Sequence, residues 1–480
     1  MSEEKKSISS GDTKLSIREK LGYSATDMAG NLLYVTVSSY IMYFYTDVFG
    51  IPASGALGAS VILLVSRFAD AISAVFWGSI VDHTKTKWGQ SRPWFLWLAG
   101  PFVVTIWLAF FAPDLPDGAP KFWYAMITYI LSAGIVYTGV QTAITALLPN
   151  MTSNPVERIN ANTFRMFGGQ LGSFITSSLC IPLVGAFGYA FTGEKNDKVG
   201  FMVTIALFGI IAFILLIFAF RSVKEHNYNP KVYKAIPFKD SLRACKGNWP
   251  WIILVLAFVV YWFAQSARNG TSTYYAKYVL GNENLTSLIN GVQVLGILGT
   301  FSMPFFVKHT SKTTTLLIGL AIGAAGQLLI PFSANFTGME FLGIPADLIA
   351  FTFFWTIGVI GAAIACGMPF AMLADTVDYG EWKTGIHAAG FLTAFGSAFC
   401  IQAGSGFGSF ITLEIMNAGG YVANQVQTAS AQDAISFCFI FFPVIVYAVE
   451  AIIMLFYRKY EKMEPQIKKE LAERHAKTNK

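Results

Sequence analysis

Apolar runs of about 20 residues recur along almost the whole of this 480-residue chain. A helix needs roughly 20 apolar residues to cross the ~30 Å hydrocarbon core of a bilayer, so each run is long enough to form one span. Hydrophobic residues make up 54% of the chain and charged residues 13%, whereas a soluble domain carries about 25% charged residues. The sequence therefore predicts an all-α integral membrane protein and excludes an ordinary soluble domain.

Hydropathy predicts about twelve of these spans. The first 20 residues are polar and contain no apolar core followed by a cleavage site, so we expect the first span itself to direct the chain to the membrane. The expected spans are 24–49, 56–80, 94–112, 121–147, 161–190, 199–220, 249–279, 285–308, 313–333, 346–374, 389–416 and 433–457.

Basic residues gather at the N-terminus, in the middle of the chain and in the last 23 residues. All three segments fall on one side when twelve spans are threaded, and the opposite loops VFGIPASGAL and SANFTGMEFLGIPAD contain no Lys or Arg. The positive-inside rule then places both termini in the cytoplasm. We expect the protein in the inner (cytoplasmic) membrane of the cell. This orientation explains the net charge of +6 without a nucleic-acid partner.

The basic middle segment divides the spans six and six, which is typical of a transporter built from two six-helix bundles. The last 23 residues are expected to form a short basic cytoplasmic helix or tail near anionic headgroups. The expected parts are a cytoplasmic N-terminal segment 1–23, an N-terminal bundle 24–220, a cytoplasmic central loop 221–248, a C-terminal bundle 249–457 and a cytoplasmic tail 458–480.

Two charged stretches interrupt the apolar pattern at corresponding places in the two halves: GSIVDHTKTKWGQSRPW at 78–94 and ADTVDYGEWKTG at 374–385. Both are consistent with simple polar turns between helices. They are also consistent with a cytoplasmic gate, in which ion pairs hold the ends of the two halves together and break as the halves rock. The residues expected in such a gate are Asp82, Arg92, Asp375, Asp378 and Lys383.

The second span carries two opposite charges, Arg67 and Asp70, which lie three residues apart and share a helix face. An ionisable residue in the middle of a span costs about 2.5–3.5 kcal/mol, so it usually faces a partner or a watery cavity. One interpretation is a structural pair that neutralises itself. The other is that Asp70 binds a coupling cation, H⁺ or Na⁺, while Arg67 tunes or releases it.

Three polar residues of the first span, Asp27, Asn31 and Tyr34, also share a helix face by their spacing. Asp27 lies near the expected cytoplasmic end, where it serves either the start of the helix or a site. Arg165, early in the fifth span, suits either a side chain that reaches to the membrane surface or a site.

Two amides, Gln141 and Gln402, fall inside apolar runs, where they bond neighbouring helices or the hydroxyls of a ligand. Glu450 lies well inside the last span without an assigned role. No P-loop, HExxH, CxxC or GxSxG motif occurs, and the five histidines are scattered. We therefore expect no enzyme activity, no bound metal and no cofactor.

Four stretches of the chain are distinctive: DMAGNLLYVTVSSYIMYFYTDVFGI, RFADAISAVFWGSIVDHTKTKWGQSRPW, LLPNMTSNPVERINANTFRMF and MLADTVDYGEWKTG. They resemble the glycoside-pentoside-hexuronide:cation symporters, the group of the melibiose and lactose permeases. This resemblance implies a major-facilitator fold, with a sugar bound between the two bundles and Na⁺ or H⁺ carried inward with it. It also implies that Asp70 is the cation-binding carboxylate of the second helix and Arg165 a sugar-contacting arginine of the fifth.

The chain departs from the melibiose-type pattern DxxxDP, because Ala74 and Val75 stand where that pattern has its second Asp and its Pro. Loss of one carboxylate removes half of the charge that would hold Na⁺, a hard ion that needs several oxygen ligands. We therefore expect proton coupling rather than sodium coupling.

Three further departures from the melibiose permease pattern concern residues that would bind the sugar. By the same comparison Asn31, Gln141 and Gln402 stand where melibiose permease has Asp, Asp and Lys. Amides both donate and accept hydrogen bonds, as sugar hydroxyls do, and this favours a neutral glycoside. Arg165 would also suit the carboxylate of a hexuronide.

The sequence thus predicts a secondary active transporter that imports a glycoside with a proton by alternating access. Alternatives are an uncoupled sugar facilitator or exchanger, an exporter of apolar compounds, or a sugar sensor that has lost transport. The expected partners are a sugar and the lipid bilayer. The sequence specifies neither which sugar is bound nor the oligomeric state. The residues expected to act are Asp70 on the cation, Asn31, Tyr34, Gln141, Arg165 and Gln402 on the sugar, and Arg67 and Asp27 as charge partners.

Overall fold

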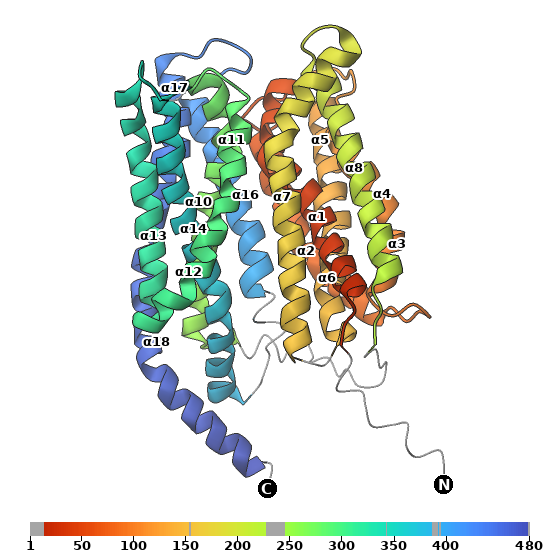
Figure 1. Cartoon of the computed structure of the whole chain (residues 1–480), viewed down its shortest axis with the longest axis vertical. Helices are drawn as coiled ribbons and strands as arrows, with labels where there is room; N and C mark the ends of the chain where they lie inside the picture. Colours follow the sequence, from red (N-terminus) through yellow and green to blue (C-terminus); the bar gives the residue numbers. More distant parts are fainter. Residues whose placement is uncertain are drawn as a thin grey trace. The chain divides into compact units, whose positions relative to one another are not determined.

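The computed structural model describes residues 14–152, 155–226, 245–341, 343–385, 392 and 395–478, apart from the side chains of a few helical residues. Almost all of the described chain is helical (Figure 1), which confirms the predicted all-α membrane class. Nine helical segments of the described residues are long and apolar enough to cross a membrane. Within the described residues, helix also covers most of each remaining predicted span, 24–49, 94–112 and 389–416.

The chain divides into two compact units. Most of the expected central loop, residues 227–244, lies outside the described residues. Unit 1 consists of Met1–Tyr233, Leu280–Gly291 and Val422–Val426, and unit 2 of Lys234–Val279, Val292–Tyr421 and Gln427–Lys480.

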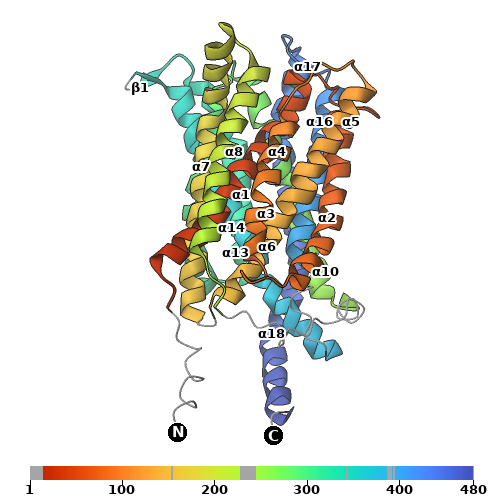
Figure 2. The same cartoon turned by 90° about the vertical axis from the view of Figure 1, so that its right-hand side faces the viewer.

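Unit 1 is a bundle in which α1, α7 and α8 pack against one another and α2 packs against α6 and η2 (Figure 2). Its elements are α1 (Ile17–Tyr43), the π-helix η1 (Phe44–Val48), α2 (Ala59–His83), α3 (Arg92–Trp97), α4 (Ala99–Ala109), α5 (Ala119–Tyr129), the π-helix η2 (Ile130–Tyr137), α6 (Thr138–Met151), α7 (Pro155–Thr192), α8 (Asp197–Ser222) and α11 (Leu285–Gly291).

Helix α1 begins at a capping box. The Ser16 hydroxyl accepts a hydrogen bond from the Glu19 amide at 3.2 Å, and the Glu19 carboxylate accepts one from the Ser16 amide at 2.9 Å. These two bonds satisfy amides that the first helical turn leaves open. Because the helix starts at Ile17, well before Asp27, the helix-start role considered for Asp27 is wrong.

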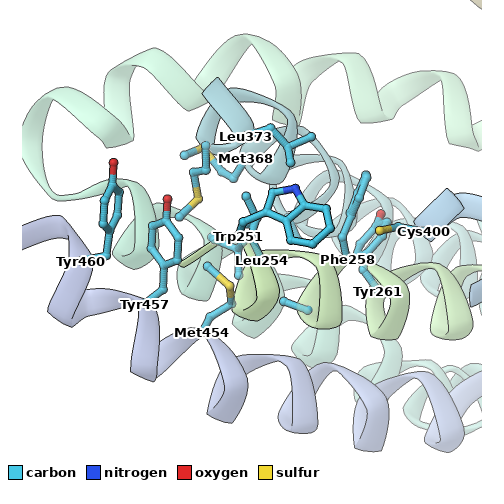
Figure 3. Close-up of a cluster of buried hydrophobic side chains, with 14 of the residues drawn as sticks. Trp251, Leu254, Phe258, Tyr261, Met368, Leu373, Cys400, Met454, Tyr457 and Tyr460 are labelled. Carbon is cyan, nitrogen blue, oxygen red and sulfur yellow. The ribbon is translucent and has the colours of Figure 1, made fainter. Parts of the chain in front are cut away.

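Unit 2 is built around a core shared by α10, α14 and α18. Figure 3 shows Trp251 and Leu254 of α10 near Met454 and Tyr457 of α18, and Phe258 and Tyr261 further along α10. Its elements are α10 (Trp249–Tyr274), the π-helix η3 (Tyr275–Val279), η4 (Val292–Leu295), α12 (Gly296–His309), α13 (Lys312–Leu329), η5 (Ile330–Phe336), the antiparallel strands β1 (Glu340–Phe341) and β2 (Ile344–Pro345), α14 (Ala346–Thr384), the π-helix η6 (Phe395–Phe399), α16 (Cys400–Ala418), α17 (Ala429–Ser436), the π-helix η7 (Phe437–Phe441) and α18 (Phe442–Thr478).

The expectation of a turn at ADTVDYGEWKTG is wrong, because α14 continues through this charged stretch to Thr384. Gly385 then ends the helix in the left-handed conformation, with φ of 74°, where a residue without a side chain is favoured. Helix α18 likewise continues beyond its apolar part to Thr478 (Figure 1). The tail is therefore helical over this range.

Glycines bring α13 and α14 into backbone contact. A side-chain carbon at Gly361 would lie 2.2 Å from the Gly323 amide nitrogen, and one at Gly326 would lie 2.2 Å from the Gly358 amide nitrogen. Small residues allow membrane helices to approach closely, and this packing replaces the hydrophobic driving force that lipid does not supply.

We predict that Gly361→Ala lowers the stability of unit 2 by about 1–3 kcal/mol, because the added methyl group overlaps the backbone of α13. Gly185→Ala is the matched control, since no atom lies within 4 Å of the carbon that it adds. Thermal unfolding of the two variants in detergent measures the effect. Equal midpoints for both variants and the wild type would contradict the proposed packing.

Candidate functional site

One face of α1 carries the polar residues of the first candidate cluster in unit 1. The Asp27 carboxylate lies 3.2 Å from Nη1 of Arg165 on α7. The Asn31 amide donates to the Asp27 carbonyl at 2.9 Å, and the Tyr34 ring stacks on Tyr137 of η2 with centroids 4.7 Å apart. The structure therefore brings Asp27, Asn31 and Arg165 together, with Tyr34 further along the same face.

A glycine on α7 makes room for this cluster. A side-chain carbon at Gly169 would lie 2.4 Å from Oδ2 of Asp27 and 3.0 Å from Nδ2 of Asn31. The Arg165 guanidinium also donates from Nε to the Asn162 side chain at 3.1 Å. Arg165 is thus held on the helix bundle by two partners, rather than only reaching towards the membrane surface.

The second cluster of unit 1 is the charge pair of α2. Nη1 of Arg67 lies 3.4 Å from Oδ2 of Asp70, and the two side chains are 6% and 1% exposed. The guanidinium lies over the Tyr129 ring, 5.8 Å from its centroid, and also interacts with Tyr34. Within the described residues, the other Asp70 oxygen, Oδ1, has no hydrogen-bond partner.

The Asp70 carboxylate faces the π-helical segment η2. A side-chain carbon at Gly134 would lie 2.9 Å from Asp70 Oδ1, and the Ser73 hydroxyl donates to the Gly134 carbonyl. Single π-helical turns inside α-helices occur frequently at functional sites. Asp70 therefore uses one oxygen for Arg67 and holds the other against glycine, which leaves that oxygen able to accept a proton.

The two candidate amides belong to different units. Gln141 on α6 directs its side-chain oxygen towards α1, 3.9 Å from where a side-chain carbon at Gly30 would lie. Gln402 lies half-buried on α16 of unit 2. Asn31, Tyr34, Gln141 and Arg165 therefore belong to unit 1, and Gln402 to unit 2.

The gate candidates of the first half lie around the start of α3. Arg92 donates from Nε to the Phe220 carbonyl at 2.6 Å and covers the Phe220 ring at 4.9 Å from its centroid. Partial burial lowers the pKa of the Arg92 guanidinium, and the nearby Glu225 carboxylate opposes this change. Asp82 lies on α2, but its side chain is outside the described residues.

Sequence reasoning missed Glu225, which organises the loop before α3. Its carboxylate accepts hydrogen bonds from the amides of Gln90, Ser91 and Arg92, at 2.9, 2.8 and 2.8 Å. A side-chain carbon at Gly89, whose φ is 116°, would lie 2.5 Å from the carboxyl carbon of Glu225. The sequence signals were the glycine in KWGQSR and a lone acidic residue in the basic segment RSVKEHN.

The gate candidate Asp375 of unit 2 belongs to a four-charge network. Its carboxylate lies 2.6 Å from Lys312 Nζ at the start of α13 and 3.2 Å from Lys468 Nζ on α18. Glu464 binds the same two ammonium groups at 2.8 and 2.6 Å. Alternating charges therefore tie the charged end of α14 to α13 and α18.

The other two gate candidates lie on the same part of α14. Lys383 is exposed, and its ammonium donates to the Gly247 carbonyl at 2.9 Å. Asp378 is half-buried, within electrostatic range of Tyr460 on α18. The partners named for Arg92, Asp375 and Lys383 all belong to the unit of the residue itself, and a latch between the two halves stays a prediction.

A further ion pair that the sequence did not reveal lies in unit 1. The Glu283 carboxylate accepts a hydrogen bond from the Tyr43 hydroxyl at 2.9 Å and binds Lys195 Nζ at 2.8 Å. It borders a cavity of about 370 Å³, which Asp197 also lines. Because 88 residues separate Lys195 from Glu283, helical spacing gave no signal for the pair.

Comparison with known proteins assigns the chain to a family. Residues 22–459 match the family described as MFS/sugar transport protein. The chain belongs to this family. The match confirms the predicted resemblance to the cation symporters of glycosides, pentosides and hexuronides, and it makes the protein a multi-pass membrane transporter and not an enzyme.

Several relatives cover nearly the whole sequence. The isoprimeverose transporter of Lactiplantibacillus pentosus is 38% identical over 96% of this chain and 92% of its own. The inner membrane symporter YicJ of Escherichia coli K12 is 32% identical over 92% of this chain and 91% of its own. The crystal structure of the nucleoside transporter NupG superposes with a TM-score of 0.61 at 11% identity, covering 91% of this chain and 98% of that one. It supports the major-facilitator fold.

We predict that Asp375→Asn and Lys312→Met are energetically coupled, because the two groups are 2.6 Å apart in a shared network. A double-mutant cycle on thermal stability measures the coupling, which we expect at about 0.5–3 kcal/mol. Asp375→Asn combined with Lys383→Met is the control, since Lys383 bonds instead to the Gly247 carbonyl. Additive effects in the first cycle would show that the network does not hold α14 to α13.

Proposed function

We propose that this protein imports a glycoside together with a proton by alternating access. The observation that carries the proposal is the buried pair on α2, in which Asp70 binds Arg67 through Oδ2 and leaves Oδ1 without a hydrogen-bond partner in the described part of the chain. A carboxylate in this position gains a proton without breaking another bond. Arg67 stabilises the ionised form after the proton leaves.

The same geometry favours H⁺ over Na⁺ as the coupling ion. Sodium needs several oxygen ligands, and the Arg67 guanidinium, 3.4 Å from Asp70, repels a second cation. One helical turn beyond Asp70, position 74 is alanine, so it supplies no carboxylate. A proton needs one oxygen and no coordination shell.

A neutral sugar suits the polar side chains outside the α2 pair. Asn31, Gln141 and Gln402 both donate and accept hydrogen bonds, which matches sugar hydroxyls. Arg165, already paired with Asp27, adds donors for ring or hydroxyl oxygens. Since the isoprimeverose transporter is 38% identical to this chain, isoprimeverose is the first ligand to test.

For transport, we propose that both termini face the cytoplasm and that the chain lies in the inner membrane. The bundles 24–220 and 249–457 rock against each other, with the sugar held between them. In this scheme Asp82, Arg92, Asp375, Asp378 and Lys383 lie at the cytoplasmic gate. The networks of Arg92 and Asp375 support the scheme by fixing helix ends that such a gate would need.

An uncoupled facilitator or exchanger is the second candidate function. It is favoured by the Arg67–Asp70 pair itself, because opposite charges at 3.4 Å already neutralise each other inside the membrane. Under this alternative Asp70 is a structural partner, and the sugar equilibrates without being accumulated.

The test separates coupling from sugar binding. We expect Asp70→Asn to keep sugar exchange across proteoliposome membranes near the wild-type rate, because exchange needs no net proton movement. Accumulation driven by an imposed pH gradient should fall to the equilibrium level. Glu194→Gln is the control, since Glu194 is exposed between α7 and α8.

Two results would contradict the proposal. Accumulation by Asp70→Asn equal to that of the wild type would remove Asp70 from coupling. Equilibration without accumulation in both proteins would establish the facilitator.

A further inference from the structure

Glu450 is a buried carboxyl group in the middle of α18, and the proposed mechanism does not use it. Its side chain is fully buried, and within the described ranges neither of its oxygens has a hydrogen-bond partner. Tyr447 and Met454 lie three and four residues away, so they share its helix face. Both belong to the hydrophobic core of unit 2, where Figure 3 shows Met454 beside residues of α10.

Titratable groups of α10, α14 and α18 lie near this part of the core. Arg268 and Tyr261 come from α10, Cys366 from α14 and Tyr447 from α18 itself, and both tyrosines lie within electrostatic range of Arg268 and Glu450. The Tyr261 hydroxyl is occupied, because it donates to the Ala362 carbonyl at 2.8 Å.

Arg268 is the only arginine in this group. It is 2% exposed and lies over the Trp355 ring, 5.1 Å from the ring centroid. Among the described residues its Nε and Nη1 atoms bond to no acceptor. Arg268 and Glu450, whose side chains can carry opposite charges, therefore lie near the same two tyrosines. They form no direct ion pair with each other.

The surroundings of the Glu450 carboxyl group determine its protonation state. A buried carboxylate without hydrogen bonds or a bound cation is strongly disfavoured, and such a group takes up a proton instead. Ionisable residues inside membrane spans frequently mark proton pathways. A carboxyl group that binds a proton becomes neutral and fits an apolar core.

We propose that Glu450 is a second proton-binding site, located in unit 2 and separate from Asp70. The carboxyl group takes up H⁺ from water, holds it as COOH in the conformation seen here, and releases it as H⁺ to leave a carboxylate. Arg268, which lies within electrostatic range of the same two tyrosines as Glu450, is the candidate to balance this carboxylate after release. Only the use of this proton in transport rests on the proposed symport; the binding of the proton does not.

Infrared titration of the full-length protein in lipid tests the site without any sugar. A protonated carboxyl group gives a C=O stretching band that shifts in deuterated water and disappears as the pH rises. We expect the wild type to show one such band that Glu450→Gln lacks, while the band of protonated Asp70 stays in both proteins. Asp433→Asn, which changes an exposed carboxylate of α17, should leave the band in place.

Separate controls test the folding of the Glu450 variant and its role in transport. Glu450→Asp keeps an acid at this position and should restore a titrating band, which shows that the loss in Glu450→Gln is not misfolding. Identical spectra for Glu450→Gln and the wild type at every pH would overturn the proposal. If the band is found but no pH gradient drives uptake, the proposed symport is wrong and the proton site at Glu450 is retained. If a pH gradient drives uptake but the band is absent, only the proton site at Glu450 is rejected.

Discussion

Neutralising charge inside hydrocarbon is the constraint on which the arrangement of unit 1 depends. Asp27 is balanced by Arg165, and Asp70 by Arg67. The Asp27–Arg165 pair joins α1 to α7, whereas Arg67 and Asp70 both lie on α2. A glycine lies against the carboxylate in each case, Gly169 on α7 and Gly134 on η2. The polar face of α1 contacts both pairs, because its Asp27 binds Arg165 and its Tyr34 interacts with Arg67. A cation site and a sugar site on this scaffold would therefore respond to each other through α1.

The charged groups of unit 2 are neutralised in a different way. Its ion network, built on Asp375, lies at the charged ends of α13, α14 and α18, where several partners share each charge. Helix α14 continues through the charged stretch ADTVDYGEWKTG, in which Lys312 and Lys468 bind Asp375, and it ends at Gly385. Glu450 is the exception, since it lies in the apolar core without such partners in the described part of the unit. That contrast is the reason to treat it as a proton site and not as part of the scaffold.

The sequence predicted the features that depend on local spacing. Apolar runs identified the spans, and the three-residue separation of Arg67 and Asp70 predicted their contact. It did not predict the partner of Arg165, because Asp27 lies 138 residues away, and no periodicity links distant helices. The end of α14 was also placed too early, because hydropathy reports where the apolar run stops and not where the helix stops. The roles of Gly134 and Glu225 depend on the atoms opposite them, which only the fold supplies.

The central claim is that sugar and proton move together. It is tested most directly by adding isoprimeverose to a lightly buffered, de-energised suspension of cells that express the protein, while the external pH is recorded. Symport predicts a transient rise in external pH that starts with sugar entry, does not require Na⁺ and vanishes when a protonophore is present. Entry of labelled sugar with no change in external pH would contradict the claim and leave an uncoupled carrier.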